Sequence, residues 1–402
     1  MAKRLPSGVE QRAIARLVRF QVEVPSWGYA DTGTRFGKWL QDAAAVDLAD
    51  KLADAGVTHR FTGITPTVAV HVLWDFPDGF DPAVVRLAKK HGVRIGSINP
   101  NLFQEQCYKH GSVTNRDPAI RERSVRHVLD CIELSKKTRS RYISMWLGDG
   151  TNYPGQGDIR QRKHWATQCY RRMHAALPHG KVLLIEYKPF EPATYATDFF
   201  DWGSSYVFAK ACGPRAKVLV DIGHHLPGCN VEQVVAWLLD EKMLGGFHFN
   251  DRKYADDDLT TGSIDPYQTF RIFNELVAYE WQTGRDLDIA WMIDQSHAVK
   301  PKIEAMIQTA CMIQALMAKA LLVDRKALAA AQAREDTVAA EECLRSAFFA
   351  DVAPVLAAVR KKLGVPADPL AAYRASGYEA AVAKERRAKR EALGLTAGGS
   401  YA

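Results

Sequence analysis

Short apolar runs rich in β-branched residues alternate with longer segments of helical periodicity between about residues 66 and 296. This alternation is typical of β–α–β units that build a parallel sheet. Seven predicted strands cover residues 66–74, 93–101, 142–150, 181–189, 217–225, 244–251 and 287–296. Residues 17–24 form an eighth candidate strand, which completes a set of eight repeats.

Capping signals mark the helices expected between these strands. Three dipeptides place a capping aspartate directly before a proline, and they are Asp81-Pro82, Asp117-Pro118 and Asp265-Pro266. Proline suits the first helical position because the N–H that it lacks would have no partner there. We therefore expect helices over residues 81–91, 117–138 and 264–281, and a further helix over residues 42–55 after the first strand.

Eight repeats favour an α/β fold of the (β/α)8 TIM-barrel type over an open doubly wound sheet. No G-x-G-x-x-G or Walker-type loop follows the first strands to indicate a nucleotide-binding sheet. Beyond Pro301 the strand pattern ends, and residues 302–322, 325–333 and 338–363 are rich in Ala, Leu, Glu and Arg. We expect a catalytic barrel domain over residues 1–300, including an N-terminal extension, and a C-terminal helical region over residues 301–402 that serves oligomerisation.

The composition excludes several classes of protein. With 402 residues, 47% of them hydrophobic and 25% charged, the chain has the composition of a globular protein with a large core. The seven cysteines lie at irregular spacings without a C-x-x-C pair, which favours reduced thiols. The sequence shows neither a secretory signal pattern nor an apolar run of membrane length. We therefore expect a soluble, cytoplasmic protein without a membrane partner.

The charge of the chain is mildly positive, with a net value of +7. The densest basic run, residues 384–389, lies in the C-terminal tail and apart from the candidate site residues described next. We interpret this run as a solvated surface rather than a nucleic-acid interface, and we expect no nucleic-acid partner.

Polar residues gather at the C-terminal ends of four predicted strands. They are Glu186 and Lys188, Asp221 and His224, His248, and Asp294. In a barrel these strand ends meet at one mouth, although they are far apart in the sequence. Because a buried carboxylate without a partner is costly, acidic and imidazole groups that converge there indicate a metal ion.

Each of these residues also has a plain structural explanation when it is taken alone. Glu186 can form a salt bridge with Lys188 or an arginine. His248 can be a hydrogen-bonded core histidine, and Asp294 can cap the next helix. Four strand ends on the same rim would each need a separate explanation of this kind, so the pattern as a whole favours a metal site.

An acidic triplet follows His248 and contributes Asp256 and Asp258, which point the same way in an extended loop. The triplet alone indicates a solvated turn, but beside His224 its carboxylates suit a second ion. Oxygen-rich ligation with one imidazole per ion fits Mn²⁺, Mg²⁺ or Co²⁺ better than a structural zinc site, and no cysteine lies in the cluster. Using all these ligands requires two ions.

Aromatic residues lie at the same predicted mouth. His71 and Trp74 end one strand, and Trp146 lies near the end of another. Aromatic faces beside fixed polar groups suit a sugar, which offers both C–H faces and hydroxyls. Core packing explains each tryptophan equally well when it is taken alone.

The combination of Glu186-x-Lys188, Asp221-x-x-His224, His248, Asp256-x-Asp258 and Asp294 resembles the two-metal centre of the xylose isomerase-like barrel superfamily. More narrowly, several blocks between about residues 20 and 320 resemble the Pseudomonas-type L-rhamnose isomerases. These blocks are PSWGYADTGTRFG (25–37), VAVHVLWD (68–75), INPNLFQ (98–104), YKHGSVTN (108–115), IEYKPFEP (185–192), VDIGHH (220–225), FHFNDRKYADDD (247–258) and MIDQSHAVKPKIEAMIQT (292–309).

The resemblance implies two divalent ions per subunit, with Mn²⁺ expected first and Co²⁺ or Mg²⁺ as alternatives. One ion, which orients the substrate, is held by four residues: Glu186, Asp221, His248 and Asp294. Asp221 bridges to a second, catalytic ion, which is completed by His224, Asp256 and Asp258.

The resemblance also implies roles around the sugar. Lys188 hydrogen-bonds the sugar near its carbonyl end, and His71 lies near the ring oxygen, where ring opening moves a proton. Trp74 and Trp146 wall the substrate pocket, which Asp294 also borders. Phe36 resembles a residue that a neighbouring subunit lends to the pocket, which implies a homotetramer.

These implications lead us to expect an aldose–ketose isomerase that interconverts L-rhamnose and L-rhamnulose, and related sugars such as D-allose and D-psicose. Many metal ligands and no obvious spare carboxylate base favour a metal-mediated hydride shift over an enediol route. A ketose 3-epimerase of the same superfamily is the main alternative, because it needs the first ligand set alone. A metal-dependent barrel endonuclease and a non-catalytic sugar-binding barrel are further alternatives.

Overall fold

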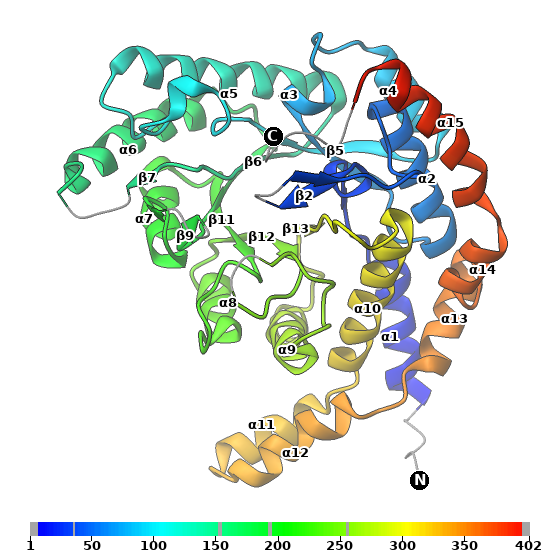
Figure 1. The fold of residues 1–402 in the computed structure, drawn as a ribbon. Coiled ribbons are helices and arrows are strands. Elements are labelled where there is room, and N and C mark those ends of the chain that lie inside the picture. The colour runs from blue at the N-terminus through cyan, green and yellow to red at the C-terminus, as the bar shows by residue number, and fades with distance from the viewer. Residues whose placement is uncertain (1–6, 35–36, 152–154, 192–194, 255–256, 396–402) are drawn as a thin grey trace.

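Eight parallel strands form a nearly closed barrel that helices surround in the computed structural model (Figure 1). The structure describes residues 7–34, 37–151, 155–191, 195–254 and 257–395. In their order around the barrel, the strands are β1 (Val24–Pro25), β4 (Thr67–His71), β5 (Arg94–Asn99), β6 (Tyr142–Met145), β8 (Val182–Glu186), β11 (Ala216–Asp221), β12 (Leu244–Phe249) and β13 (Ala290–Ile293). The predicted TIM-barrel fold is therefore confirmed.

The barrel closes through the residue that precedes β1. The backbone N–H of Glu23 donates to the carbonyl oxygen of Trp291 at 2.7 Å, and the N–H of Ile293 donates to the carbonyl oxygen of Glu23 at 2.8 Å. These two bonds form a parallel bridge between Glu23 and β13. The first and last strands of the sheet are thus joined, which leaves no long open edge.

One helix of the surrounding layer follows each barrel strand, which gives the eight expected repeats. These helices are α2 (Leu48–Thr62), α4 (Ala83–Lys90), α5 (Pro118–Thr138), α6 (Ile159–Ala176), α7 (Trp202–Cys212), α8 (Val231–Asp240), α9 (Pro266–Thr283) and α10 (Lys302–Leu321). The predicted starting signals are confirmed at α5 and α9, where Asp117 and Asp265 accept backbone N–H bonds in front of a proline.

Two apolar cores hold this arrangement together. A large cluster fills the space between the strands and the helices, and a small one fills the barrel itself. The small cluster consists of Leu184, Leu219, Ala290 and Met292, which are buried side chains of strands β8, β11 and β13. The C-terminal strand ends stand above this layer, so the barrel interior is packed and the polar groups lie at its mouth.

The predicted N-terminal strand over residues 17–24 is wrong in its first part. Helix α1 (Ser7–Arg19) extends through Leu17, and only Val24–Pro25 forms a strand. Ala13, Leu17 and Phe20 are all buried, and their spacing of four and three residues places them on one face of a helix. This helical spacing outweighs the β-branched character of the segment.

Several other predicted boundaries also differ from the structure. The strand predicted over residues 66–74 ends at His71, because Val72–Asp75 forms the short helix α3. The helix predicted over residues 42–55 begins only at Leu48, where Asp47 caps it by accepting from the N–H of Asp50. Residues 338–363 form two helices, α12 (Thr337–Phe348) and α13 (Ala353–Leu363).

The chain after Pro301 is helical, as predicted. Helix α10 packs against α9 and α2 and so lies in the ring of barrel helices. Helices α11 (Arg325–Ala333) and α12 pack on each other and project from the barrel, while α13, α14 (Pro369–Ala375) and α15 (Tyr378–Ala392) run back along its side (Figure 1). The basic run was expected to be solvated, but its Arg386 is buried against α2.

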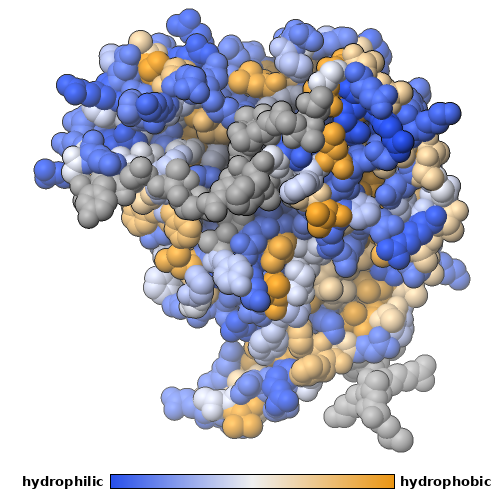
Figure 2. All heavy atoms as spheres, in the orientation of Figure 1, coloured by the Kyte–Doolittle hydropathy of each residue, from blue (hydrophilic) through white to orange (hydrophobic). Residues whose placement is uncertain are grey.

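Small elements decorate the loops at the barrel mouth. They are the hairpin of β2 (Thr32–Thr34) and β3 (Gly37–Trp39), the sheet of β7 (Gly150–Thr151), β10 (Tyr195–Thr197) and β9 (Phe190–Glu191), and the 3-10 turns η1 (Trp27–Tyr29) and η2 (Gln106–Tyr108). In the view of Figure 2 hydrophilic residues predominate, and hydrophobic ones form separate groups.

Within the described ranges, no single helix has the length and apolar composition of a membrane span. Helices α10 and α11 reach this length and apolar composition only when they are taken together, and the two helices meet at a bend of 58°.

Candidate metal centre

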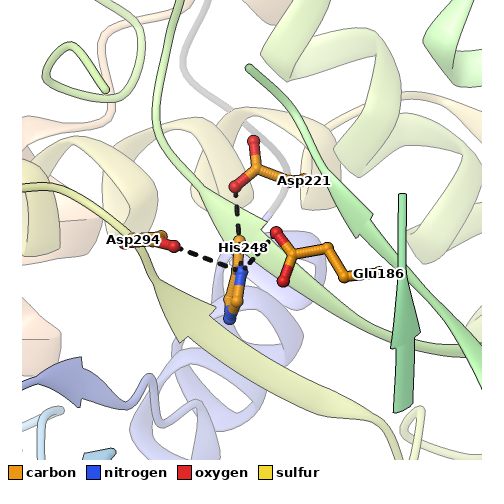
Figure 3. Close-up of side chains that lie close together, drawn as sticks. All are labelled: Glu186, Asp221, His248 and Asp294. Atoms are coloured by element: carbon orange, nitrogen blue, oxygen red, sulfur yellow. Dashed lines mark hydrogen bonds and ion pairs between the residues drawn. The ribbon is translucent and has the colours of Figure 1, made fainter. Parts of the chain in front are cut away.

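Four residues from four neighbouring strand ends converge at the barrel mouth. They are Glu186, Asp221, His248 and Asp294, and Figure 3 shows the three carboxylates arranged around the imidazole. Each offers a ligand atom, and these atoms all lie within 4.8 Å of one another. Three carboxylates and one imidazole form a donor set that suits an oxygen-preferring divalent ion. The four residues that the sequence predicts for the first ion are therefore brought together.

The imidazole of His248 faces all three carboxylates. Its Nδ1 lies 3.2 Å from an oxygen of Glu186, 3.7 Å from Asp221 and 3.5 Å from Asp294. Glu186 and Asp221 are buried, whereas the side chain of Asp294 is 21% exposed. Asp294 is therefore the residue of this set that is most accessible to solvent.

The charged groups in this cluster shift the pKa values of one another. Burial disfavours a charged imidazole, but Glu186, Asp294 and Asp221 outweigh burial and raise the pKa of His248 to about 9. Burial also disfavours the charged form of Glu186, yet His248 and His224 lower its pKa well below the usual range. Burial raises the pKa of Asp294. The cluster thus needs a positive charge, which a proton on His248 supplies and a divalent cation would supply better.

His224 lies beside this cluster, as the sequence predicts. Its Nδ1 is 3.2 Å from an oxygen of Glu186 and 3.0 Å from the carbonyl oxygen of Tyr187. Its backbone N–H donates to Asp221, so the turn after β11 holds the imidazole and that carboxylate together. The neighbouring His225 instead bonds the hydroxyl of Tyr187 and the carbonyl oxygen of Ile222, which fixes it in the core.

Asp258 is joined to the first ligand set through Asn250. The side-chain amide of Asn250 donates to both oxygens of Asp221, at 3.0 and 3.1 Å, and to Asp258 at 3.3 Å. Asp258 and His224 therefore lie next to Asp221 and Glu186, respectively. Asp256 lies outside the described residues, as does Phe36. Asp257 accepts from the N–H groups of Lys253 and Tyr254, which makes it a turn residue.

Lys188 is buried two residues beyond Glu186. Its ammonium forms an ion pair with Glu191 at 2.8 Å and lies 4.9 Å from the centre of the Trp146 ring. The Nε1 group of Trp146 is buried without a hydrogen-bond partner among the described residues. A fixed cation and an unsatisfied donor next to an aromatic face are features of a site that binds a polar ligand.

An aromatic wall, formed by Trp27, His71, Trp74, Phe103 and Trp146, lines the same mouth. The ring of His71 lies 4.7 Å from Trp27 and 4.1 Å from Trp74. Phe103 joins both halves of the wall, since its ring is 5.9 Å from His71 and 4.9 Å from Trp146. Burial, together with the charge of Lys51, lowers the pKa of His71 to about 3, so the imidazole is neutral at ordinary pH.

Three residues of this site are missing from the sequence-based prediction. Trp27 donates its Nε1–H to Asp294 at 2.9 Å, Phe103 completes the aromatic wall, and Asn250 joins Asp221 to Asp258. Trp27 and Phe103 lie in loops rather than at predicted strand ends, so strand periodicity does not identify them. Asn250 directly follows β12 and satisfies the same strand-end criterion as His248.

Solved structures with a similar fold include sugar epimerases. A structure of L-ribulose 3-epimerase covers 75% of this chain and 95% of its own at a TM-score of 0.55 and 12% identity. A crystal structure of D-psicose 3-epimerase in the presence of D-fructose covers 76% and 99% at a TM-score of 0.52 and 12% identity. At this identity the similarity concerns the fold alone.

Two relatives found by sequence are much more similar to this chain than the solved structures are. A protein named "Probable sugar isomerase" from Mesorhizobium japonicum is 42% identical over 93% of this chain and 88% of its own length. A second protein of that name, from Rhizobium meliloti, is 42% identical over 95% and 90%. A xylose isomerase from Thermus thermophilus is 25% identical over 63% of this chain and 71% of its own. Residues 49–285 match the family model described as "Xylose isomerase-like TIM barrel". The chain thus belongs to the xylose isomerase-like TIM barrel family.

Proposed function

We propose that the protein is a metal-dependent aldose–ketose isomerase whose substrates are L-rhamnose and L-rhamnulose, with D-allose and D-psicose as related sugars. The observation that carries this proposal is the convergence of Glu186, Asp221, His248 and Asp294 beside an aromatic wall and a buried lysine. The relatives named as sugar isomerases over nearly the whole chain support the reaction class.

The proposed centre holds two ions, of which Mn²⁺ is the first expectation and Co²⁺ or Mg²⁺ are alternatives. The four-residue cluster would hold one ion, and Asp221, His224, Asp256 and Asp258 would hold the other. The position of Asp258, one amide away from Asp221, supports this second set. When bound, such ions polarise a sugar carbonyl and stabilise the negative charge that develops on the oxygens during isomerisation.

The side chains around the centre would bind and orient the sugar. Lys188, held by Glu191 next to Trp146, would donate a hydrogen bond to the oxygen at the carbonyl end and stabilise its charge. Neutral His71 would accept or donate a proton at the ring oxygen during ring opening. Trp74 and Trp146 would cover the C–H faces of the sugar and exclude water.

A neighbouring subunit is part of this proposal. The hairpin of β2 and β3 lies at the mouth, and Phe36 lies between these two strands in the sequence. We propose that a homotetramer forms in which this residue enters the pocket of an adjacent copy, with the C-terminal helical region contributing to the subunit contacts.

A ketose 3-epimerase is the second candidate, because one ion on the four-residue cluster would suffice for it. The fold similarity to solved 3-epimerases favours this alternative. The position of His224 and Asp258 beside the cluster argues for the isomerase, since the epimerase reaction does not need them.

A product assay distinguishes the two candidates. Metal-stripped protein is reloaded with Mn²⁺ and offered L-rhamnose, L-mannose, D-allose and D-psicose, and the products are resolved by chromatography. The proposal predicts ketose from aldose, restored only by the metal. C3-epimerised ketose without aldose would favour the epimerase, and no product with any sugar would contradict both candidates.

A further inference from the structure

The C-terminal helix α15 faces a row of aspartates with its basic side chains. The partners are Arg386 with Asp54, Arg387 with Asp42, Lys389 with Asp47 and Asp50, and Arg390 with Asp31. All five aspartates lie in residues 31–54, which run from the loop after the first barrel strand into helix α2. Figure 1 shows α15 running along the outside of α2. Helix α15 therefore binds this segment electrostatically over four of its own residues.

The side chains of Arg386 and Arg390 are buried, and each binds both an aspartate and a backbone carbonyl oxygen. Arg386 donates to both oxygens of Asp54, at 2.7 and 2.8 Å, and to the carbonyl oxygen of Ala43 at 2.6 Å. Arg390 pairs with Asp31 at 3.1 Å and donates to the carbonyl oxygen of Gln41 at 3.0 Å. The side chain of Arg390 is only 6% exposed, so its charge depends on these partners.

The contacts of Arg390 continue directly to the loop that carries a metal ligand. Asp31 accepts the backbone N–H of Gln41 at 2.8 Å. The side-chain amide of Gln41 in turn donates to the carbonyl oxygens of Ala298 at 3.0 Å and His297 at 3.4 Å. Residues 297 and 298 belong to the loop between β13 and α10, which begins with Asp294, so Gln41 fixes one side of this loop.

The segment that bears Asp31 contacts the same loop on its other side. Trp27 donates its indole N–H to Asp294, and its carbonyl oxygen accepts from the hydroxyl of Ser296 at 3.4 Å. A Cβ atom at Gly28 would lie 2.7 Å from the carbonyl oxygen of Gln295, which shows how closely the two segments approach. The position of residues 27–31 therefore bears on the orientation of the Asp294 carboxylate.

We propose that Arg390 is a positioning residue for the metal centre, which acts through Asp31, Gln41 and residues 27–31 on Asp294. In this view the C-terminal helix is required for the geometry of the barrel mouth, besides any part in subunit contacts. The proposal rests on the proposed function in one respect, namely that Asp294 binds a metal ion. Since the network is formed from partly buried hydrogen bonds and one ion pair, its disruption should shift the loop without removing any ligand.

The test is Mn²⁺ binding by the full-length protein, measured by equilibrium dialysis. Arg390→Gln removes the charge and should weaken the binding of Mn²⁺ roughly three- to tenfold. Asp31→Asn removes the other half of the pair and should give a similar loss. The double variant should lose little more than either single variant, because both substitutions disrupt the same path. Arg387→Gln is the matched control, since Arg387 and Asp42 are both more than half exposed.

The outcomes separate this inference from the proposed function. Wild-type Mn²⁺ affinity in a folded Arg390→Gln variant would overturn the positioning role, even if the melting temperature falls. Should that variant fail to fold, the affinity of Asp31→Asn decides in the same way. Asp294→Asn tests the site itself: Mn²⁺ binding that does not change in this variant would contradict the metal centre, whereas a loss there beside unchanged Arg390→Gln would overturn the positioning role alone.

Discussion

His248 is the residue on which the charge balance of the metal centre depends. Three carboxylates raise its pKa to about 9, so the imidazole carries a proton at neutral pH when no ion is bound. A divalent ion can use this nitrogen only after the proton leaves. Below a pH of about 9 we therefore expect the Mn²⁺ affinity to rise roughly tenfold per pH unit, and binding to release close to one proton. Calorimetry in buffers of different ionisation enthalpy measures that proton, and binding without proton release would contradict this role for His248.

A substitution of Lys188 tests whether its ammonium binds the oxygen at the carbonyl end of the sugar. Its ammonium is held beside Trp146 by Glu191, so the charge is fixed before the substrate binds. Lys188→Met should lower kcat by roughly 100-fold and the affinity for the sugar much less, because the charge acts mainly on the developing oxyanion. Steady-state kinetics with L-rhamnose give both quantities. A variant with an unchanged kcat would show that this side chain does not face the reacting carbonyl.

Substitutions of Asp256 and Asp258 test whether the protein binds a second ion. Asp256→Asn combined with Asp258→Asn should abolish turnover, and Asp258→Asn alone should lower it by about 100-fold while one ion stays bound. Asp257→Asn is the control, since Asp257 caps a turn by accepting two backbone N–H bonds. Metal analysis of the dialysed variants counts the ions. Full activity in the double variant would refute the two-ion centre.

The convergence of Glu186, Asp221, His248 and Asp294 could be predicted because each ends an apolar strand, where a carboxylate or an imidazole is conspicuous. The places of Trp27 and Phe103 in the site could not be predicted in this way, because they depend on how the loops fold over the barrel mouth. A tryptophan in a loop has the same local sequence whether it packs in the core or donates to Asp294.

At the scale of elements, Glu23 connects the barrel seam to strand β5. The register of β4 and β5 shifts next to Gly96, and the N–H of Ser97 donates to the buried carboxylate of Glu23 at 2.9 Å. A Cβ atom at Gly96 would lie 1.5 Å from an oxygen of Glu23. The irregularity in the ladder and the acidic side chain thus fit each other.

Replacing Gly96 tests this contact. Gly96→Ala should lower the free energy of unfolding by about 2 kcal/mol or more, because the carboxylate must leave its hydrogen bonds. Gly203→Ala, in helix α7, is the control: its Cβ would meet nothing closer than 3.5 Å, and stability should change by less than about 1 kcal/mol. Urea unfolding measures both variants. Equal stability of the Gly96 variant and the wild type would contradict the role of Glu23.

Element types could be predicted where one periodicity dominates, as in the strands before Glu186 and Asp221. The prediction failed at residues 17–19, where buried Leu17 belongs to a helical face although the β-branched Val18 and Val22 favour a strand. Strand ends were predicted too long where the residues that follow a strand keep its apolar character. Val72 and Leu73 illustrate this, because they continue β4 in sequence but form α3.

At the scale of the whole molecule, the eightfold alternation of strands and helices could be predicted from the sequence alone. The placement of the C-terminal tail could not, because the pairing of Arg386 and Arg390 with Asp54 and Asp31 spans more than 330 residues. A basic run has the same local pattern whether it faces solvent or an acidic helix.

The central claim, metal-dependent aldose–ketose isomerisation by a hydride shift, is tested most directly by one reaction in D₂O. Protein reloaded with Mn²⁺ is incubated with L-rhamnulose, and the products are followed by NMR spectroscopy. We predict L-rhamnose that carries no deuterium on carbon, because the hydrogen moves directly between C1 and C2. Deuterium at C2 of the aldose would contradict the hydride shift, and a C3-deuterated ketose without aldose would contradict the isomerase itself.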